Sequence, residues 1–110
     1  MEKKFGRGDI VWLDFSPTHG HEQKGKRPAL VLSPEKYNVR SKLMLVCPIT
    51  SQQKGHPFEV PIQAKVSGVV LADQIRSIDW TARKVTKTGV APKHTLQEVA
   101  RLISLILPEH

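Results

Sequence analysis

Apolar residues in this chain occur in short runs, and glycine, proline or small polar residues separate one run from the next. Runs of this length with turn residues at both ends predict β-strands. All are far shorter than the ~20 apolar residues that a membrane-spanning helix requires. The predicted strands are residues 8–15, 28–33, 43–49, 58–62 and 67–71.

Two of these runs carry additional information. The run at 28–33 is apolar on both faces, which predicts a strand in the centre of a sheet. Pro48 lacks the N–H group that would donate to a neighbouring strand, so the run at 43–49 is expected to bulge or to leave the sheet there. Between these two runs, Ser33 is a candidate cap for a helical turn over 34–39, with Pro34 at its tolerated first position.

The end of the chain predicts one longer helix. Leu96, Val99, Leu102, Ile103 and Ile106 recur at three- and four-residue spacings. Thr95 precedes Glu98 by three residues, which is a capping-box pattern, and Pro108 ends the helix.

Five strands and a terminal helix predict a mainly β fold, a small barrel with the C-terminal helix over an open side. The polar stretch at 72–80 and the basic stretch at 83–90 are not predicted as strands. Trp12 and Trp80 are both assigned to the core.

Composition limits the possible compartments and partners. A chain of 110 residues predicts one domain over 1–110. The single cysteine, Cys47, excludes an intrachain disulfide and favours a reducing compartment. With no apolar segment behind its charged start, we expect a soluble cytoplasmic protein without membrane contact. The net charge of +7 favours a polyanionic partner such as nucleic acid, although an acidic protein segment or no specific partner fits equally well.

The most unusual polar stretch is 19–28, which joins two apolar runs and ends in Arg27-Pro28. It holds imidazoles, a carboxylate, a carboxamide, ammonium groups and a guanidinium within ten residues. An exposed hairpin loop of no chemical role is an equally good interpretation from composition alone.

Three polar segments flank the predicted strands and could meet at one end of a small barrel. Cleaving RNA without a metal requires a base for the 2′-hydroxyl, an acid for the leaving oxygen and a fixed cation. Arg27 is the best candidate for the cation, because its planar fork can bind two phosphate oxygens. The segments contain His21, Glu22, Lys24, Lys26 and Arg27, then Thr50, Ser51, Gln52 and Gln53, then Asp73, Gln74 and Arg76.

Less chemical interpretations exist for several of these residues. Asp73 could cap a turn, and Thr50 could bond to its own backbone. His56 and His94 are assigned no role. Cys47 is interpreted as a buried small residue. No zinc pattern includes His19 or His21, and no nucleotide or dinucleotide motif is present, so no metal or cofactor is predicted.

A series of short motifs extends over nearly the whole chain in a fixed order. The most specific is GxEQxGxRP, which begins at Gly20 and ends at Pro28. The series comprises residues 8–12, 14–18, 20–23, 26–34, 48–51, 55–60 and 72–80. It resembles the MazF/PemK family of toxins of type II toxin–antitoxin systems.

The resemblance implies an SH3-like barrel, a homodimer and a metal-independent endoribonuclease that cuts single-stranded RNA such as mRNA at short motifs. It also implies a cognate antitoxin whose acidic C-terminal segment occupies the RNA groove. The catalytic pair would be Arg27 and Thr50. His21 and Glu22 are alternative bases, and Arg76 is a second possible cation. The RNA-binding set would be Gln23, Lys24, Lys26, Ser51, Gln52, Asp73, Gln74 and Arg76.

One departure from the family matters for the mechanism. In the branch of the family that shares His21, an arginine stands where this chain has Ala72. A mechanism that depends on that arginine cannot operate here. Two other functions fit the same fold: a non-catalytic toxin that binds DNA gyrase, and a basic RNA-binding module. The gyrase binder would have no use for Arg27 and Thr50.

Overall fold

The computed structural model describes residues 3–15 and 25–108. His21, Glu22, Gln23 and Lys24, and most of the polar stretch at 19–28, therefore lie outside the described residues. The described part contains β1 (Asp9–Asp14), β2 (Lys26–Val31), α1 (Glu35–Ser41), β3 (Leu43–Thr50), β4 (Glu59–Gln63), β5 (Ser67–Leu71), β6 (Arg76–Asp79), β7 (Thr86–Val90) and α2 (Lys93–Ile106).

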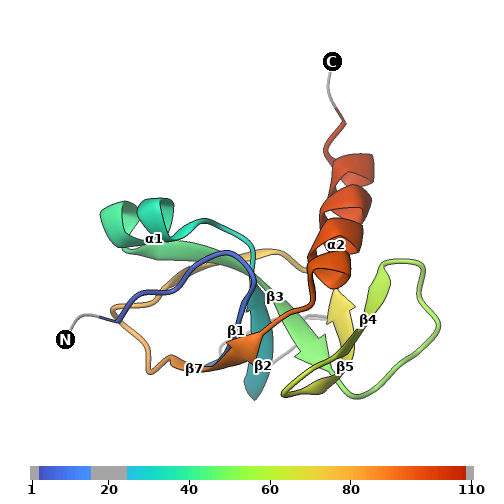
Figure 1. Ribbon diagram of the computed structural model, residues 1–110, viewed down its shortest axis with the longest axis horizontal. Helices are drawn as coiled ribbons and strands as arrows, with labels where there is room; N and C mark the ends of the chain where they lie inside the picture. The colour runs from blue at the N-terminus through green and yellow to red at the C-terminus, as the bar shows by residue number, and fades with distance from the viewer. Residues whose placement is uncertain (1–2, 16–24, 109–110) are drawn as a thin grey trace.

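The strands form a curled antiparallel sheet in the order β4-β5-β3-β2-β1-β7, with β6 paired to β3 outside this path (Figure 1). The predicted central position of β2 is confirmed. β3 pairs with β2 along one side. Along its other side, β3 pairs first with β6, through Leu43–Val46, and then with β5, through Ile49 and Thr50. Pro48 lies where β3 changes neighbour while its pairing with β2 continues.

Because neighbouring strands run in opposite directions, β1 and β3 end at the edge of the sheet where β2 and β7 begin. We call this edge the rim. Asp14, Lys26, Thr50 and Thr86 are the strand residues at the rim.

Side chains of alternate residues in β1, β2 and β3 enter two separate cores. One face contributes Ile10, Leu30 and Cys47 to a core that includes Val99 and Leu102 of α2. The other face contributes to a core inside the curl, built from Val11, Leu13, Phe15, Ala29, Val31, Met44, Val46, Ile78 and others. The predicted fold class, a mainly β small barrel with the C-terminal helix on an open side, is confirmed (Figure 1).

Several local predictions were wrong. The stretches at 72–80 and 83–90 contain β6 and β7, which pair with β3 and β1. The capping box is not formed: α2 begins after Pro92, and the buried Thr95 hydroxyl has no hydrogen-bond partner among the described residues. Ser33 does not cap α1; its hydroxyl donates to the side-chain oxygen of Asn38.

The two tryptophans also differ from one another. Trp80 packs edge-on against Phe5, and its indole N–H donates to the Asn38 carbonyl at 2.8 Å. Trp12 is half-buried and belongs to neither core, so its assignment to the core was wrong.

Within the described residues, α1 and α2 are both too short and too polar to span a bilayer.

Gly68 allows β5 to approach the end of β3. Its φ of +145° lies in a region that other residues rarely adopt. A Cβ atom at this position would collide with the carbonyl oxygen of Thr50, which is backbone and cannot swing aside. The position of Thr50 at the rim therefore depends on the missing side chain of Gly68.

Replacing Gly68 with alanine should destabilise the protein by at least about 2 kcal/mol, because overpacking and backbone strain act together. Urea denaturation would measure the loss. Gly6→Ala is the matched control, since its Cβ would make only ordinary contact with Glu35. Equal stability of the two variants would contradict this account of Gly68.

Candidate nucleic-acid site

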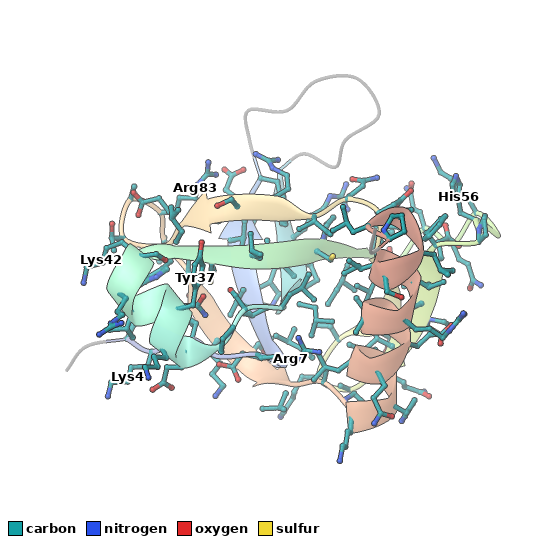
Figure 2. All side chains as sticks on the ribbon, turned by 90° about the horizontal axis from the view of Figure 1, so that it is seen from above. Lys4, Arg7, Tyr37, Lys42, His56 and Arg83 are labelled. Carbon is teal, nitrogen blue, oxygen red and sulfur yellow. The ribbon has the colours of Figure 1, made fainter. Side chains whose placement is uncertain are left out.

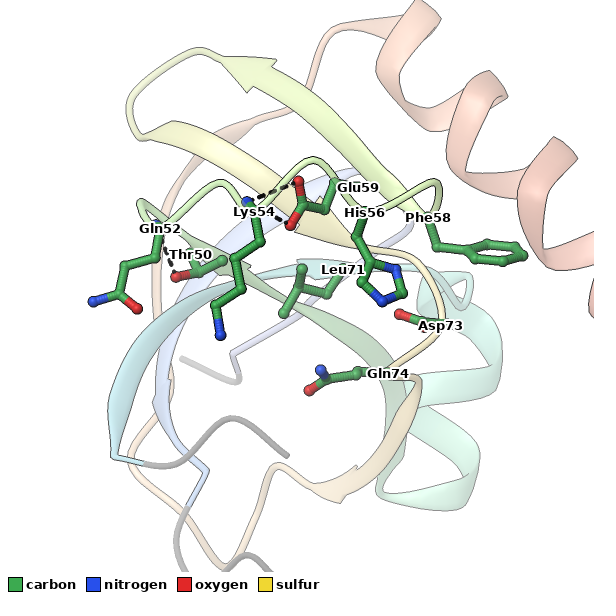
Figure 3. A pocket seen from close by; sticks show the side chains of 9 residues that line it. All are labelled: Thr50, Gln52, Lys54, His56, Phe58, Glu59, Leu71, Asp73 and Gln74. Atoms are coloured by element: carbon green, nitrogen blue, oxygen red, sulfur yellow. Dashed lines mark hydrogen bonds between the residues drawn. The ribbon is translucent and has the colours of Figure 1, made fainter. Parts of the chain in front are cut away.

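A hollow of about 230 Å³ opens beside the end of β3. Four of the residues predicted for the site line it: Thr50, Gln52, Asp73 and Gln74. They come from two polar segments that are more than twenty residues apart in the sequence. The remaining lining residues are Lys54, His56, Phe58, Glu59 and Leu71 (Figure 3).

Thr50 is buried, and its hydroxyl oxygen accepts the backbone N–H of Gln52 at 3.1 Å. The expectation that Thr50 could bond to its own backbone is therefore correct. This bond does not use the hydroxyl proton, so Thr50 can still donate to a ligand oxygen. The residue is both a turn-forming group and a fixed hydrogen-bond donor.

The Glu59 carboxylate fixes the loop that follows Thr50. It accepts the backbone N–H groups of Lys54, at 3.0 and 3.2 Å, and of Gly55, at 3.1 Å. Gly55 has a φ of +77°, which allows the chain to turn around the carboxylate. Figure 3 shows the Lys54 side chain crossing the hollow, with His56 near Asp73 on its other side.

The hollow therefore combines a hydroxyl, carboxamides, an ammonium group, an imidazole and a carboxylate, with Phe58 and Leu71 as apolar wall. An ammonium and a hydroxyl can bind a phosphate oxygen. Amide and carboxylate groups can read the hydrogen-bonding edge of an unstacked base. This set suits single-stranded nucleic acid.

Arg27 lies in β2, one residue inside the rim, and is half-buried. The pairing of β2 with β3 joins Ala29 to Pro48 and Val31 to Val46. Continuing the same register by two residues sets Arg27 opposite Thr50. Opposite residues in an antiparallel pair point to the same face, so this register would bring the two side chains to one side of the sheet.

Arg76, in β6, is tied to the core. Its guanidinium donates to the Phe15 carbonyl at 3.0 Å and lies over the Phe15 ring at 5.6 Å. It is half-buried and does not line the hollow. Ser51 is exposed and is likewise not among the lining residues, and Lys26 lines a different hollow.

Sequence reasoning missed Lys54, His56 and Glu59. One sequence signal pointed to them: Glu59 follows Lys54-Gly55 by four residues, and a carboxylate at that distance can close a turn by accepting backbone N–H groups. His56 had been assigned no role, although its side chain lines the hollow.

Cys47 is fully buried, as predicted. Burial, and to a smaller extent the charge of Asp73, raises the pKa of its thiol to about 12. It is therefore an un-ionised core residue at neutral pH and not a nucleophile. In the described segments, no group of three His, Cys, Asp or Glu side chains is placed to hold a metal ion.

Residues 6–107 match the family model of the PemK-like, MazF-like toxins of type II toxin–antitoxin systems. The chain belongs to this family. It is 46% identical over 101 residues to the endoribonuclease toxin MazF of Escherichia coli K12, with 91% of each chain covered. It is 36% identical to the endoribonuclease PemK of Escherichia coli, covering 92% of this chain and 80% of PemK.

Solved structures support the same family assignment. MazF from Deinococcus radiodurans superposes with a TM-score of 0.93 at 48% identity, covering 98% of this chain and all of that one. A MazE–MazF structure from the same organism gives 0.85 at 43% identity, covering 99% and 100%. The predicted family is thus confirmed, and the relatives are endoribonucleases, which favours an endoribonuclease over a gyrase-binding toxin or a non-catalytic module.

Replacing Glu59 with glutamine should loosen the loop over the hollow, because an amide is a weaker acceptor than a carboxylate and offers only one oxygen. We expect the amide protons of Lys54 and Gly55 to exchange with solvent about tenfold faster. Hydrogen exchange followed by NMR would measure this.

Glu98→Gln is the control, since Glu98 pairs with Arg101 on α2, away from the hollow. Unchanged exchange at Lys54 and Gly55 in Glu59→Gln would show that the carboxylate does not hold the loop.

Proposed function

We propose that the chain is a toxin endoribonuclease that cuts single-stranded RNA, including mRNA, without a metal ion. The observation that carries the proposal is the match to endoribonuclease toxins over about nine-tenths of the chain, together with the gathering of Thr50, Gln52, Asp73 and Gln74 in one hollow. Such a substrate would place its action in the cytoplasm.

In the proposed reaction, a base removes the proton from a ribose 2′-hydroxyl, and the 2′-oxygen attacks the adjacent phosphorus. The bond from phosphorus to the 5′-oxygen then breaks, and that oxygen leaves with a proton. The products carry a 2′,3′-cyclic phosphate and a 5′-hydroxyl. Arg27 stabilises the charge that develops on the phosphorane oxygens and supplies the leaving proton, while Thr50 holds the phosphate by its hydroxyl.

The continued register between β2 and β3 supports this pair, because it sets Arg27 opposite Thr50. Arg27 is the second residue of β2, and Ala29, Leu30 and Val31 further along the strand are buried between β1 and β3, so its backbone is held rigidly. His21 and Glu22 remain alternative candidates for the base. Arg76 contributes a second positive charge beside the core. Its guanidinium donates to the Phe15 carbonyl, which holds this charge in place.

The proposed polypeptide partner is a cognate antitoxin with an acidic C-terminal segment. Two observations support it. Structures of MazF with MazE are among the close structural relatives. The chain also carries a net charge of +7, which favours association with an acidic segment.

We also propose a homodimer. Several large apolar side chains stay exposed on the described surface, and three are consecutive at the end of α2: Leu105, Ile106 and Leu107. This end of α2 projects beyond the sheet (Figure 1). Exposed apolar side chains that lie together are typical of an interface.

Arg27→Ala should lower the rate of RNA cleavage by about 10²–10³-fold, since it removes the cation that stabilises the phosphorane. Arg27→Lys should recover little, because an ammonium cannot bind two oxygens at once. Cleavage of an unstructured RNA in excess chelator, with analysis for cyclic-phosphate ends, measures both. Arg40→Ala, on the exposed surface of α1, is the control. Undiminished cleavage by Arg27→Ala would refute the assignment.

Gel filtration at micromolar concentration should give twice the mass of one chain. The double substitution Leu105→Lys and Leu107→Lys should shift the protein towards the monomer, because it places charges in the proposed interface. The control substitutions Lys36→Glu and Arg40→Glu reverse two surface charges on α1 and should leave the dimer intact. A wild-type monomer would contradict the proposal.

A further inference from the structure

A second and larger hollow, of about 540 Å³, lies on the far side of β2 from the first. Trp12 forms part of its wall, in the middle of three paired strands, where it lies opposite Pro28 of β2 and Thr86 of β7. Val11 and Leu13 on either side of Trp12 are fully buried, whereas Trp12 is half-buried. The indole therefore faces out of the barrel into the hollow.

Arg83 fixes the opposite wall. Its guanidinium donates to the backbone carbonyl of Asp14 at 2.7 Å, which ties residues 82–84 across the end of β1. Asp14 is paired in register with Lys26 of β2. Three cationic residues thus line the hollow together with Trp12: Lys26, Arg83 and Lys84. The volume falls in the range of ~300–1,000 Å³ that small-molecule sites occupy.

These groups fit a nucleotide. A flat indole can stack on any base, and the surrounding cations can bind the phosphates. The exposed Asp14 carboxylate can accept a hydrogen bond from a base amino group. The carboxylates of an acidic peptide would satisfy the cations, but aspartate and glutamate side chains offer no aromatic ring to stack on the indole.

The second hollow shares the rim with the proposed catalytic residues. Lys26, which lines the hollow, and Arg27 are consecutive residues of β2 and so point to opposite faces. Figure 2 shows Arg83 and His56 in the upper part of the view, with Lys4 in the lower part. His56 lines the first hollow and Arg83 the second. One RNA strand that crosses the rim can therefore contact both.

We propose that this second hollow is a nucleotide subsite of the RNA-binding surface, in which a base flanking the cleavage point stacks on Trp12 while Lys26, Arg83 and Lys84 bind its phosphates. The inference deepens the proposed function and rests on it for the identity of the strand. It gives Trp12 a role in affinity for longer RNA and none in bond cleavage.

Binding can be measured apart from cleavage with a 12-nucleotide 2′-O-methyl RNA of mixed sequence, which lacks the attacking hydroxyl. Binding of this probe should quench tryptophan fluorescence, and Trp12→Leu should remove most of the quenching and weaken binding about tenfold. Tyr37→Leu is the matched control, because Tyr37 is an exposed aromatic residue on α1. Thermal melts confirm that each variant is folded.

The phosphate contacts are tested by the salt dependence of the same binding. Lys84→Gln should lower the slope of log Kd against log salt by about 0.7, the value for one contact to a single strand. Lys4→Gln, in the lower part of the view in Figure 2, should leave the slope unchanged. Cleavage of an unstructured RNA in chelator is measured in parallel.

Each result separates the two proposals. If the wild type cleaves RNA but both variants match their controls, the subsite is wrong and the endoribonuclease stands. If the probe binds through Trp12 but no RNA is cut, the proposed function fails and the subsite remains as an RNA-binding site. Adenosine monophosphate or polyglutamate that binds as tightly as the probe, with the same loss in Trp12→Leu, would overturn the strand subsite in favour of a free nucleotide or a protein segment.

Discussion

The arrangement of the molecule depends on one strand, β3, which changes its neighbour part-way along its length. It pairs with β2 on one side, and on the other first with β6 and then with β5. Pro48 lies at the change, where the missing N–H is no loss because the strand is passing from one neighbour to the next. Both cores receive residues from β3. The change of neighbour along β3 therefore determines both the curl of the sheet and the position of Thr50 at the end of the strand.

The hollow beside Thr50 is held by backbone contacts. Gly68 allows β5 to pass close to the Thr50 carbonyl, and Glu59 accepts the N–H groups of Lys54 and Gly55. A loop whose backbone is anchored in this way loses less freedom when it binds a ligand, which favours affinity. The backbone of the loop is thus pre-positioned although the loop itself is exposed.

Sequence patterns predicted the elements whose side chains are buried and missed those held by backbone pairing. The runs that became β1, β2 and β3 are apolar because both cores use them. In β6 only Ile78 is buried, and β7 has no buried residue, so neither leaves an apolar signal. The capping box failed because Pro92, with its fixed φ, begins α2 before Thr95.

The site shows the same division. Thr50, Gln52, Asp73 and Gln74 were predicted, because they end or follow apolar runs that indicated strands, and the hollow brings them together. Lys54 and His56 were missed because the spacing from Gly55 to Glu59 was not interpreted as a turn closed by the Glu59 carboxylate, and their placement depends on that turn. Trp12 was assigned to the core because tryptophan is usually buried, whereas alternation along β1 turns it outward.

Alternation along β2 also gives the rim its two sides. Arg27 points to the face that the register shares with Thr50, while Lys26 points to the face of Trp12. A protein that only cut RNA would need the first side alone. Because the two sides are one residue apart, a single RNA strand would, under the two proposals, be bound on one side and cut on the other. In the proposed arrangement, the strength of binding can change through residues such as Lys84 without disturbing the geometry at Arg27, which is a physical basis for varying substrate preference while the proposed catalytic pair stays constant.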